Sequence, residues 1–426
     1  MIPKLNILKS SLFRESATLA TGYITAQAIS LLAYLLLTRI FSPADYALFN
    51  IFYSYIEVLV ILSTCKYELA IVGADNETES SAVAHFSLKL NAAVSLLLLT
   101  IIATLYLTHS LPGSFSRLGA LSLLIPPMVF FVGTSRIYTS LYNRVRRYRK
   151  IAASNIVNAA SGALLKVLLG LAGLFRVGLP LGTVLGQAVA NLVFRFRLSS
   201  LQLPKTTRGQ QLDAARRHKN FPLYIASRDL VGCISANLPF LWLALYFDQA
   251  AVGLFALALT FTFNPVNMLS SSFERVFYAR TAEKVRNRQP IAHTLRRFLL
   301  LLNAIAVPVA IGVWFVAEPL FSFCFSNSWR GCGIYVQMLL PWILLRLSSG
   351  SLVFISYIFS VQNIEFYFNL AMLALRVAAI AIGIHMGSFT LAILLYAAAG
   401  ALVSASLLVW YLICVRRYEK SLKDSL

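Results

Sequence analysis

The feature that most constrains this chain is a succession of mainly apolar runs, each about 20 residues or longer, along nearly its whole length. A helix needs about 20 apolar residues to cross the roughly 30 Å hydrocarbon core of a bilayer, where every backbone hydrogen bond must be made internally. Because 58% of the 426 residues are hydrophobic and only 12% are charged, a water-soluble fold would expose much apolar surface. A soluble enzyme and a soluble nucleic-acid-binding domain are therefore excluded.

The apolar runs are continuous rather than short and alternating, which favours helices over the strands of an outer-membrane barrel. We therefore predict an all-α, polytopic membrane protein. The first run is long and leads into further runs, so we expect an uncleaved first helix rather than a secretory signal. The twelve predicted helices cover residues 16–40, 46–72, 84–108, 117–142, 151–173, 179–199, 221–247, 252–274, 298–317, 332–358, 365–385 and 389–414.

The Lys and Arg residues between the predicted helices are divided unevenly. Connections on the side of the N-terminus carry 26 of them, and connections on the opposite side carry 4. Since cytoplasmic loops of membrane proteins carry such an excess, we predict that both termini are cytoplasmic. The same bias accounts for most of the net charge of +21, so we expect no nucleic acid as a partner.

The two halves of the chain resemble each other. Residues 47–49 (Ala-Leu-Phe) align with 253–255 (Gly-Leu-Phe), and residues 67–68 (Tyr-Glu) align with 273–274 (Phe-Glu) at the same offset. We therefore predict two pseudo-symmetric six-helix lobes, which share one topology because six is an even number, and which are joined by a basic cytoplasmic linker. The predicted lobes are residues 1–203 and 204–426.

Residues 38–49 (Thr-Arg-Ile-Phe-Ser-Pro-Ala-Asp-Tyr-Ala-Leu-Phe) and 66–72 (Lys-Tyr-Glu-Leu-Ala-Ile-Val) resemble the first two helices of bacterial polysaccharide biosynthesis flippases. These are the O-antigen and capsule repeat-unit translocases of the multidrug/oligosaccharidyl-lipid/polysaccharide exporter superfamily. One departure is Ala47, where the family usually has Gly. The resemblance implies a multi-pass protein of the bacterial inner membrane and a polyprenyl-diphosphate-linked oligosaccharide as substrate. It also suggests membrane lipid, a polysaccharide polymerase and a chain-length regulator as partners.

Cations inside the predicted helices indicate a cavity. A charge at bilayer depth costs roughly 2.5–3.5 kcal/mol on insertion scales, so most such residues should face an interior space. Lys166 and Arg376 are too deep to reach the headgroups easily, and they lie at corresponding places in the two repeats. Arg offers a planar fork and Lys a point charge for a diphosphate, whereas an ion pair within one lobe is the structural alternative. The predicted substrate-binding residues are Arg39, Lys66, Arg136, Lys166, Arg228, Arg346 and Arg376.

Acidic residues inside the predicted helices are fewer than the cations. Glu57 and Glu68 are eleven residues apart in one predicted helix, which places them on one polar face. The matching helix of the second half carries Glu274, and we expect it to be interrupted at Pro265. We predict that these faces border a central cleft. The candidate residues for a coupling proton or sodium ion are Glu57, Glu68, Asp229 and Glu274.

The sequence gives little support for enzymatic chemistry. It contains no Walker loop, no H-E-x-x-H motif and no dinucleotide fingerprint, so we expect neither catalysis nor a cofactor or bound metal. Cys324 and Cys332 flank a predicted outer connection in an oxidising compartment. Sequence reasoning leaves open whether they form a disulfide or remain two free thiols.

The resulting hypothesis is a lipid-linked oligosaccharide flippase that works by alternating access. Because the sequence contains no recognisable ATP site, an ion gradient, the membrane potential or consumption of the product should drive it. A multidrug exporter of the same superfamily is one alternative, and it should hold carboxylates without an excess of Arg and Lys. A membrane polysaccharide polymerase or ligase is another, and it should have a larger outer loop than residues 318–331 provide.

Overall fold

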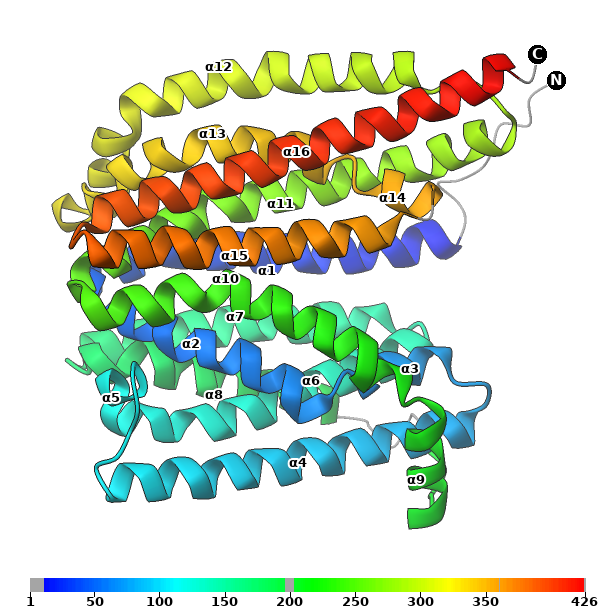
Figure 1. Ribbon diagram of the computed structural model, residues 1–426. Coiled ribbons are helices and arrows are strands. Elements are labelled where there is room, and N and C mark those ends of the chain that lie inside the picture. Colours follow the sequence, from blue (N-terminus) through cyan, green and yellow to red (C-terminus); the bar gives the residue numbers. More distant parts are fainter. Residues whose placement is uncertain (1–10, 196–202, 360, 425–426) are drawn as a thin grey trace. The chain divides into compact units, whose positions relative to one another are not determined.

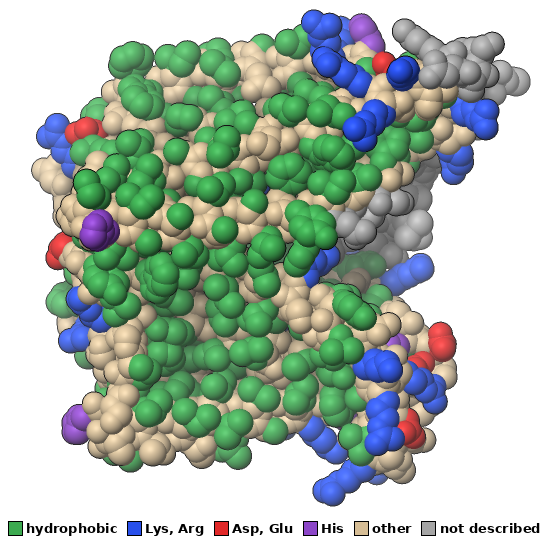
Figure 2. All heavy atoms as spheres, in the orientation of Figure 1, with side chains coloured by type: hydrophobic (Ala, Val, Ile, Leu, Met, Phe, Trp, Pro, Cys, Tyr) green, Lys and Arg blue, Asp and Glu red, His purple; other side chains and the backbone are tan. Residues whose placement is uncertain are grey.

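The computed structural model describes residues 11–195, 203–359 and 361–424, and these residues form helices without any β-strand (Figure 1). Twelve helices among the described residues are long and apolar enough to cross a membrane, which confirms the predicted number. Hydrophobic side chains cover the middle of the visible helices, while Lys and Arg gather near helix ends (Figure 2). The chain is therefore a multi-pass, all-α membrane protein. Lys4 and Lys9 of the N-terminal segment, which count toward the predicted cytoplasmic excess, lie outside the described residues, as do residues 198–202 of the predicted linker between the lobes.

The first compact unit extends to Ile234. In this unit α7 packs against both α1 and α8, and α4 packs against α6 and α9. Its elements are α1 (Ser11–Ile40), α2 (Pro43–Thr64), α3 (Tyr67–Gly73), α4 (Glu77–Leu107), α5 (Phe115–Leu118), η2 (Gly119–Leu124), α6 (Ile125–Arg144), α7 (Tyr148–Leu171), α8 (Phe175–Arg195), α9 (Arg208–Arg217) and η4 (Phe221–Ala226).

The second compact unit begins at Ser235, inside α10 (Ser227–Tyr246). Its central helix is α13, which packs against α11, α12 and α16, while α15 packs along α16. The remaining elements are α11 (Gln249–Arg286), α12 (Ala292–Phe325), η5 (Asn327–Trp329), α13 (Cys332–Gly350), α14 (Phe354–Ile358), α15 (Gln362–His385) and α16 (Phe389–Asp424).

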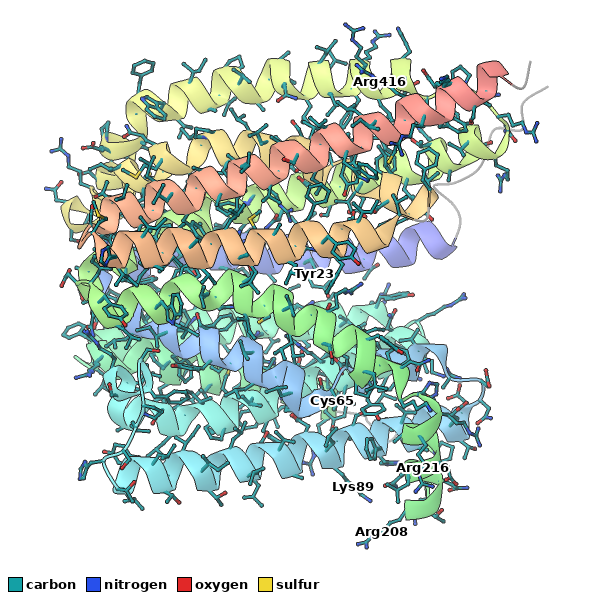
Figure 3. All side chains as sticks on the ribbon, viewed as in Figure 1. Tyr23, Cys65, Lys89, Arg208, Arg216 and Arg416 are labelled. Carbon is teal, nitrogen blue, oxygen red and sulfur yellow. The ribbon has the colours of Figure 1, made fainter. Side chains whose placement is uncertain are left out.

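The linker helix α9 belongs structurally to the first unit. Its Ala214 and Ala215 are buried in one hydrophobic cluster with Tyr67, and Lys89 of α4 donates a hydrogen bond to Gln211 Oε1 at 2.9 Å. Figure 3 labels Lys89 on α4 and Arg208 and Arg216 on α9. These contacts explain why the compact unit continues past the proposed lobe boundary at residues 203 and 204. The division of the sequence repeat at that boundary stays a prediction.

A break between α2 and α3 corrects the predicted continuous helix 46–72. Cys65 and Lys66 have φ values of 47° and 59°, in the left-handed region. This conformation costs roughly 1–2 kcal/mol per non-glycine residue, so surrounding contacts must stabilise it. Because the helix is interrupted, the regular spacing that placed Glu57 and Glu68 on one face does not apply, and that expected stripe is wrong.

Proline positions were a weaker guide to helix ends than expected. The predicted interruption at Pro265 is wrong, because α11 continues through it. Likewise, α12 contains Pro308 and Pro319 and continues to Phe325, which shortens the expected outer connection. In membrane helices, neighbouring polar side chains, ordered water and small local changes of helix geometry can satisfy the backbone groups that proline leaves free.

The interface between α7 and α8 depends on glycine. A Cβ atom added at Gly186 would lie 2.6 Å from Gly162 Cα, and one added at Gly182 would lie 2.9 Å from the backbone nitrogen of Lys166. Small residues four apart allow the backbones of membrane helices to approach closely. The two helices can therefore place side chains of α7 and α8 around one cavity.

We expect Gly186→Ala to lower the free energy of unfolding by roughly 1–3 kcal/mol, because the added methyl group meets backbone atoms that cannot rotate away. Unfolding of the purified protein in detergent measures this loss. Gly232→Ala is the matched control, since a Cβ atom at Gly232 meets nothing within 4 Å. Equal stability of the two variants would contradict close packing of α7 on α8.

Candidate functional site

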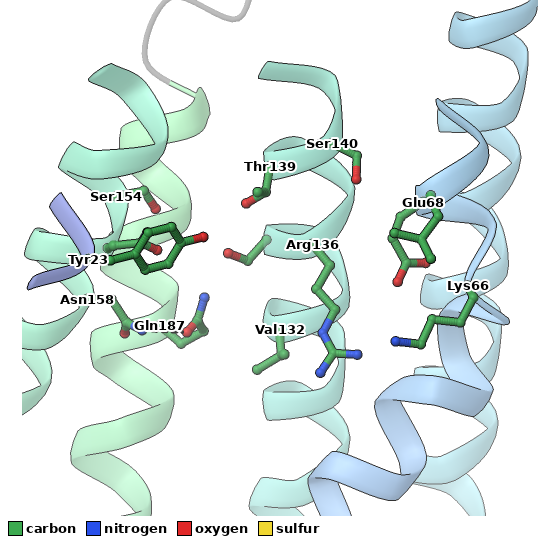
Figure 4. Close-up of a pocket in the computed structure, with 13 residues that line it drawn as sticks. Tyr23, Lys66, Glu68, Val132, Arg136, Thr139, Ser140, Ser154, Asn158 and Gln187 are labelled. Carbon is green, nitrogen blue, oxygen red and sulfur yellow. Dashed lines mark hydrogen bonds between the residues drawn. The ribbon is translucent and has the colours of Figure 1, made fainter. Parts of the chain in front are cut away.

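A cavity of about 390 Å³ lies inside the first unit, between α1, α3, α6, α7 and α8 (Figure 4). Every lining residue except Leu69 and Val132 carries a polar or charged group. One end carries the charged side chains, and the other end carries carboxamides, hydroxyls and one tyrosine ring. The lining residues are Tyr23, Lys66, Glu68, Leu69, Val132, Ser135, Arg136, Thr139, Ser140, Ser154, Asn155, Asn158 and Gln187.

The charged end holds Lys66, Glu68 and Arg136, and Figure 4 shows Lys66 and Arg136 pointing toward one another. Lys66 Nζ lies 2.9 Å from Asp229 Oδ2, and its side chain is 15% exposed. Asp229 Oδ1 also lies 3.0 Å from the guanidinium of Arg228. Glu68 is 3% exposed, and its Oε2 has no hydrogen-bond partner among the described residues. The helix break thus brings Lys66 and Glu68 to the same cavity.

The uncharged end is formed mainly by α7 and α8. Asn158 Nδ2 donates a hydrogen bond to Gln187 Oε1 at 2.9 Å, which joins the two helices. The Nδ2 atom of Asn155 is buried without a partner within the described part of the chain. Ser154 Oγ donates to the Ala190 carbonyl at 3.2 Å. Sequence reasoning missed these residues, although Ser154, Asn155 and Asn158 recur at helical spacing.

Three of the predicted cations in the first unit lie outside the lining of this cavity. Lys166 Nζ lies 5.1 Å from the ring centroid of Phe49, and its side chain packs beside Gly182. Arg39 is exposed in the last turn of α1. Arg228 is 67% exposed and reaches the cavity only through its pairing with Asp229. The structure therefore brings together Lys66 and Arg136 from the predicted set.

The predicted cations of the second unit form a separate cluster. Arg376 donates to the Ser235 carbonyl and hydroxyl, both at 3.2 Å, and its guanidinium lies 5.1 Å from the Trp342 ring and 4.9 Å from the Tyr396 ring. Arg346 lies within electrostatic range of Arg376. Arg376 Nε is buried without a hydrogen-bond partner among the described residues, and the predicted role of Arg346 and Arg376 in substrate binding stays a prediction.

Glu365 is a member of the same cluster that sequence reasoning missed. It accepts hydrogen bonds from Ser356 Oγ at 2.7 Å and from Tyr411 OH, and it lies within electrostatic range of Arg346. It stands at the start of an apolar run, where a glutamate is usually solvated. Only the later residues Ser356 and Tyr411, brought together by folding, show that it is an internal acceptor.

The predicted acidic residues Glu57 and Glu274 are not among the residues that line the cavity. Glu57 is half-buried in α2, within electrostatic range of Tyr53, and Glu274 is half-buried in α11. Across the described residues there is no cluster of three or more His, Cys, Asp or Glu side chains that could hold a metal ion.

Cys324 and Cys332 are free thiols, so the disulfide that the sequence left open is not present. The Cys332 thiol is buried and donates its S–H to the Leu254 carbonyl of α11 at 3.2 Å, so it is directed toward α11 instead of toward Cys324. Cys324 remains inside α12, which extends one residue beyond it.

Comparison with known proteins agrees with the fold. A model of the family described as "Polysaccharide biosynthesis protein" matches residues 36–333. The succinoglycan biosynthesis transport protein ExoT of Rhizobium meliloti (strain 1021) is 23% identical over 298 residues, which cover 69% of this chain and 58% of that protein. The aligned part of the chain thus spans less than two thirds of this relative.

Solved structures of transporters share the architecture. The lipid II flippase MurJ, in an inward closed conformation, has a TM-score of 0.73 at 13% identity and covers 95% of this chain and 91% of its own. An inward-facing multidrug resistance MATE family transporter of the MOP superfamily has a TM-score of 0.65 at 12% identity. The match covers 92% of this chain and 96% of that transporter. Such low identity establishes the fold alone. The chain therefore belongs to the polysaccharide biosynthesis protein family, and its described residues have the two-lobed, twelve-helix fold of the MOP superfamily transporters.

Proposed function

We propose that this protein is an alternating-access flippase that moves a polyprenyl-diphosphate-linked oligosaccharide from the cytoplasmic to the outer leaflet for surface polysaccharide synthesis. The observation that carries the proposal is the cavity of the first unit, which has cations at one end and neutral hydrogen-bonding groups at the other. The family match supports a role in polysaccharide synthesis, and ExoT is itself described as a transport protein.

Anion binding at the charged end follows from its composition. Arg136 presents a planar fork suited to phosphate oxygens, and Lys66 supplies a compact positive charge. Among the lining residues, the two cations Lys66 and Arg136 outnumber the single carboxylate, Glu68. The net positive charge favours a diphosphate over a cationic drug.

The remaining predicted cations have secondary roles in this proposal. We infer that Lys166, Arg346 and Arg376 add to the positive potential inside their own lobes, and that Arg39 acts at a helix end.

A coupling ion needs an acidic group that can change its state during transport. Among Glu57, Glu68, Asp229 and Glu274, we favour Glu68, because it lines the cavity and its Oε2 has no hydrogen-bond partner among the described residues. Asp229 is already held by two cations. We propose a bacterial inner-membrane location with cytoplasmic termini, and a polysaccharide polymerase and a chain-length regulator as partners.

Binding by the purified protein in lipid nanodiscs tests the substrate class. The proposal expects polyprenyl diphosphate to bind, with affinity that falls as salt rises, and a lipophilic cation such as tetraphenylphosphonium to bind weakly. Tighter binding of the cation than of the diphosphate would contradict the proposal and favour a multidrug exporter. Elongation of added oligosaccharides by the purified protein would favour a polymerase.

A further inference from the structure

The uncharged end of the cavity differs from the other buried amides of the first unit. Asn91 Nδ2 and Asn191 Nδ2 donate to the carbonyls of Phe130 and Phe131 at 2.9 and 2.8 Å, so these amides fasten their helices to the backbone of α6. Asn158 and Gln187 instead bind each other and make no hydrogen bond to the backbone among the described residues. Their role is therefore not explained by helix packing alone.

The hydrogen bond between these two amides leaves a defined pair of groups for a ligand. Asn158 uses an N–H and Gln187 uses its Oε1, so Asn158 Oδ1 remains as an acceptor and Gln187 Nε2 as a donor. Both side chains line the cavity, and the nearby Asn155 Nδ2 is a buried donor without a partner within the described residues. A buried donor of this kind is costly unless something binds it.

A ligand can satisfy both of these groups when it carries a hydrogen-bond donor and a hydrogen-bond acceptor on neighbouring atoms. A sugar ring presents these groups as adjacent hydroxyls or as a hydroxyl beside an acetamido group. Tyr23, which is 52% exposed, adds a ring face at the same end of the cavity, next to Gln187 and Asn158 in Figure 4.

The size of the cavity limits how much of an oligosaccharide it can hold. Its volume of about 390 Å³ is near the lower end of the range of small-molecule pockets, roughly 300–1,000 Å³. The charged end and the amide end belong to this single space, so a sugar that binds the amides while the diphosphate binds Arg136 is the one next to the diphosphate.

We infer that Asn155, Asn158 and Gln187, with Tyr23, form a subsite that recognises the sugar attached directly to the diphosphate. This inference rests on the proposed function and deepens it. The subsite selects substrates by their first sugar. Discrimination between different first sugars then depends on hydrogen bonds to these residues of the first unit, whereas binding of the diphosphate depends on charge.

Binding of two lipids to the full chain in nanodiscs separates these contributions. The lipids are polyprenyl diphosphate and the same lipid carrying one N-acetylhexosamine. For Asn158→Leu and Gln187→Met, we expect the Kd of the sugar-bearing lipid to rise about 10- to 100-fold and the Kd of the sugar-free lipid to change less than about twofold. Ser161→Ala is the matched control, because its hydroxyl also lies between α7 and α8 but does not line the cavity.

Asn155→Leu gives a second test that leaves the Asn158–Gln187 hydrogen bond intact, and it should also weaken only the sugar-bearing lipid. An unchanged ratio of the two Kd values in folded Asn155→Leu, or equal binding of both lipids by the wild type, would overturn the subsite and leave the proposed function standing. Failure of the wild type to bind either lipid would overturn the proposed function itself.

Discussion

Export of surface polysaccharide should fall at least roughly 100-fold in cells whose only copy of this protein carries Arg136→Glu. The substitution removes the planar cation of the cavity and places a carboxylate beside Glu68, so the charged end repels a diphosphate. Arg136→Lys keeps the charge without the fork and should retain partial export. Polysaccharide at the cell surface and protein in the membrane fraction are measured together.

Arg208→Glu is the matched control for this prediction. It makes the same change of charge on the exposed linker helix α9, away from the cavity, and should leave export near normal. Normal export by Arg136→Glu would show that the cavity does not bind the diphosphate. Equal losses in both variants would attribute the effect to overall charge or to membrane insertion.

The second large effect concerns stability of the second unit. Glu365→Leu removes the acceptor of the buried Ser356 and Tyr411 hydroxyls and the carboxylate near Arg346. We expect the free energy of unfolding to fall by roughly 2–4 kcal/mol, because two buried hydroxyls lose their acceptor and Arg346 loses a nearby opposite charge. Unfolding of the purified protein in detergent measures the loss.

Two further variants identify the cause of the stability loss in Glu365→Leu. Glu365→Gln keeps an oxygen acceptor and should lose much less stability. Glu318→Gln breaks an ion pair with Arg330, whose side chain is 68% exposed, and should cost no more than about 1 kcal/mol. If Glu365→Leu were as mild as Glu318→Gln, Glu365 would not be an internal partner of the cluster.

The number of membrane helices was predictable because lipid imposes one requirement, a long apolar run, on every span. The helix break at Cys65 and Lys66 was not predictable, because neither glycine nor proline marks it in the sequence. Its conformational cost is offset by tertiary contacts such as the Lys66–Asp229 ion pair. Residue spacing in a continuous helix therefore gave a wrong face for Glu68 and no reason to place it beside Lys66.

The candidate site was predictable only in its charges. Depth in the membrane singled out Lys166 more strongly than Arg136, but whether a cation lines a cavity depends on neighbours such as Gly182 that sequence depth ignores. The amide end was not predictable in this way, because neutral amides cost less to bury than charges and their depth in the membrane therefore does not indicate a cavity. The polar spacing of Asn155 and Asn158 along α7 was the available signal.

Transbilayer movement of a fluorescent polyprenyl-diphosphate-linked oligosaccharide in proteoliposomes tests the central claim most directly. The measured quantity is the rate at which label in the inner leaflet becomes accessible to a membrane-impermeant quencher. The account predicts rapid movement with the wild-type protein, and movement no faster than in protein-free vesicles with Arg136→Glu. Equal rates with both proteins, or no movement above protein-free vesicles with folded wild-type protein, would contradict it.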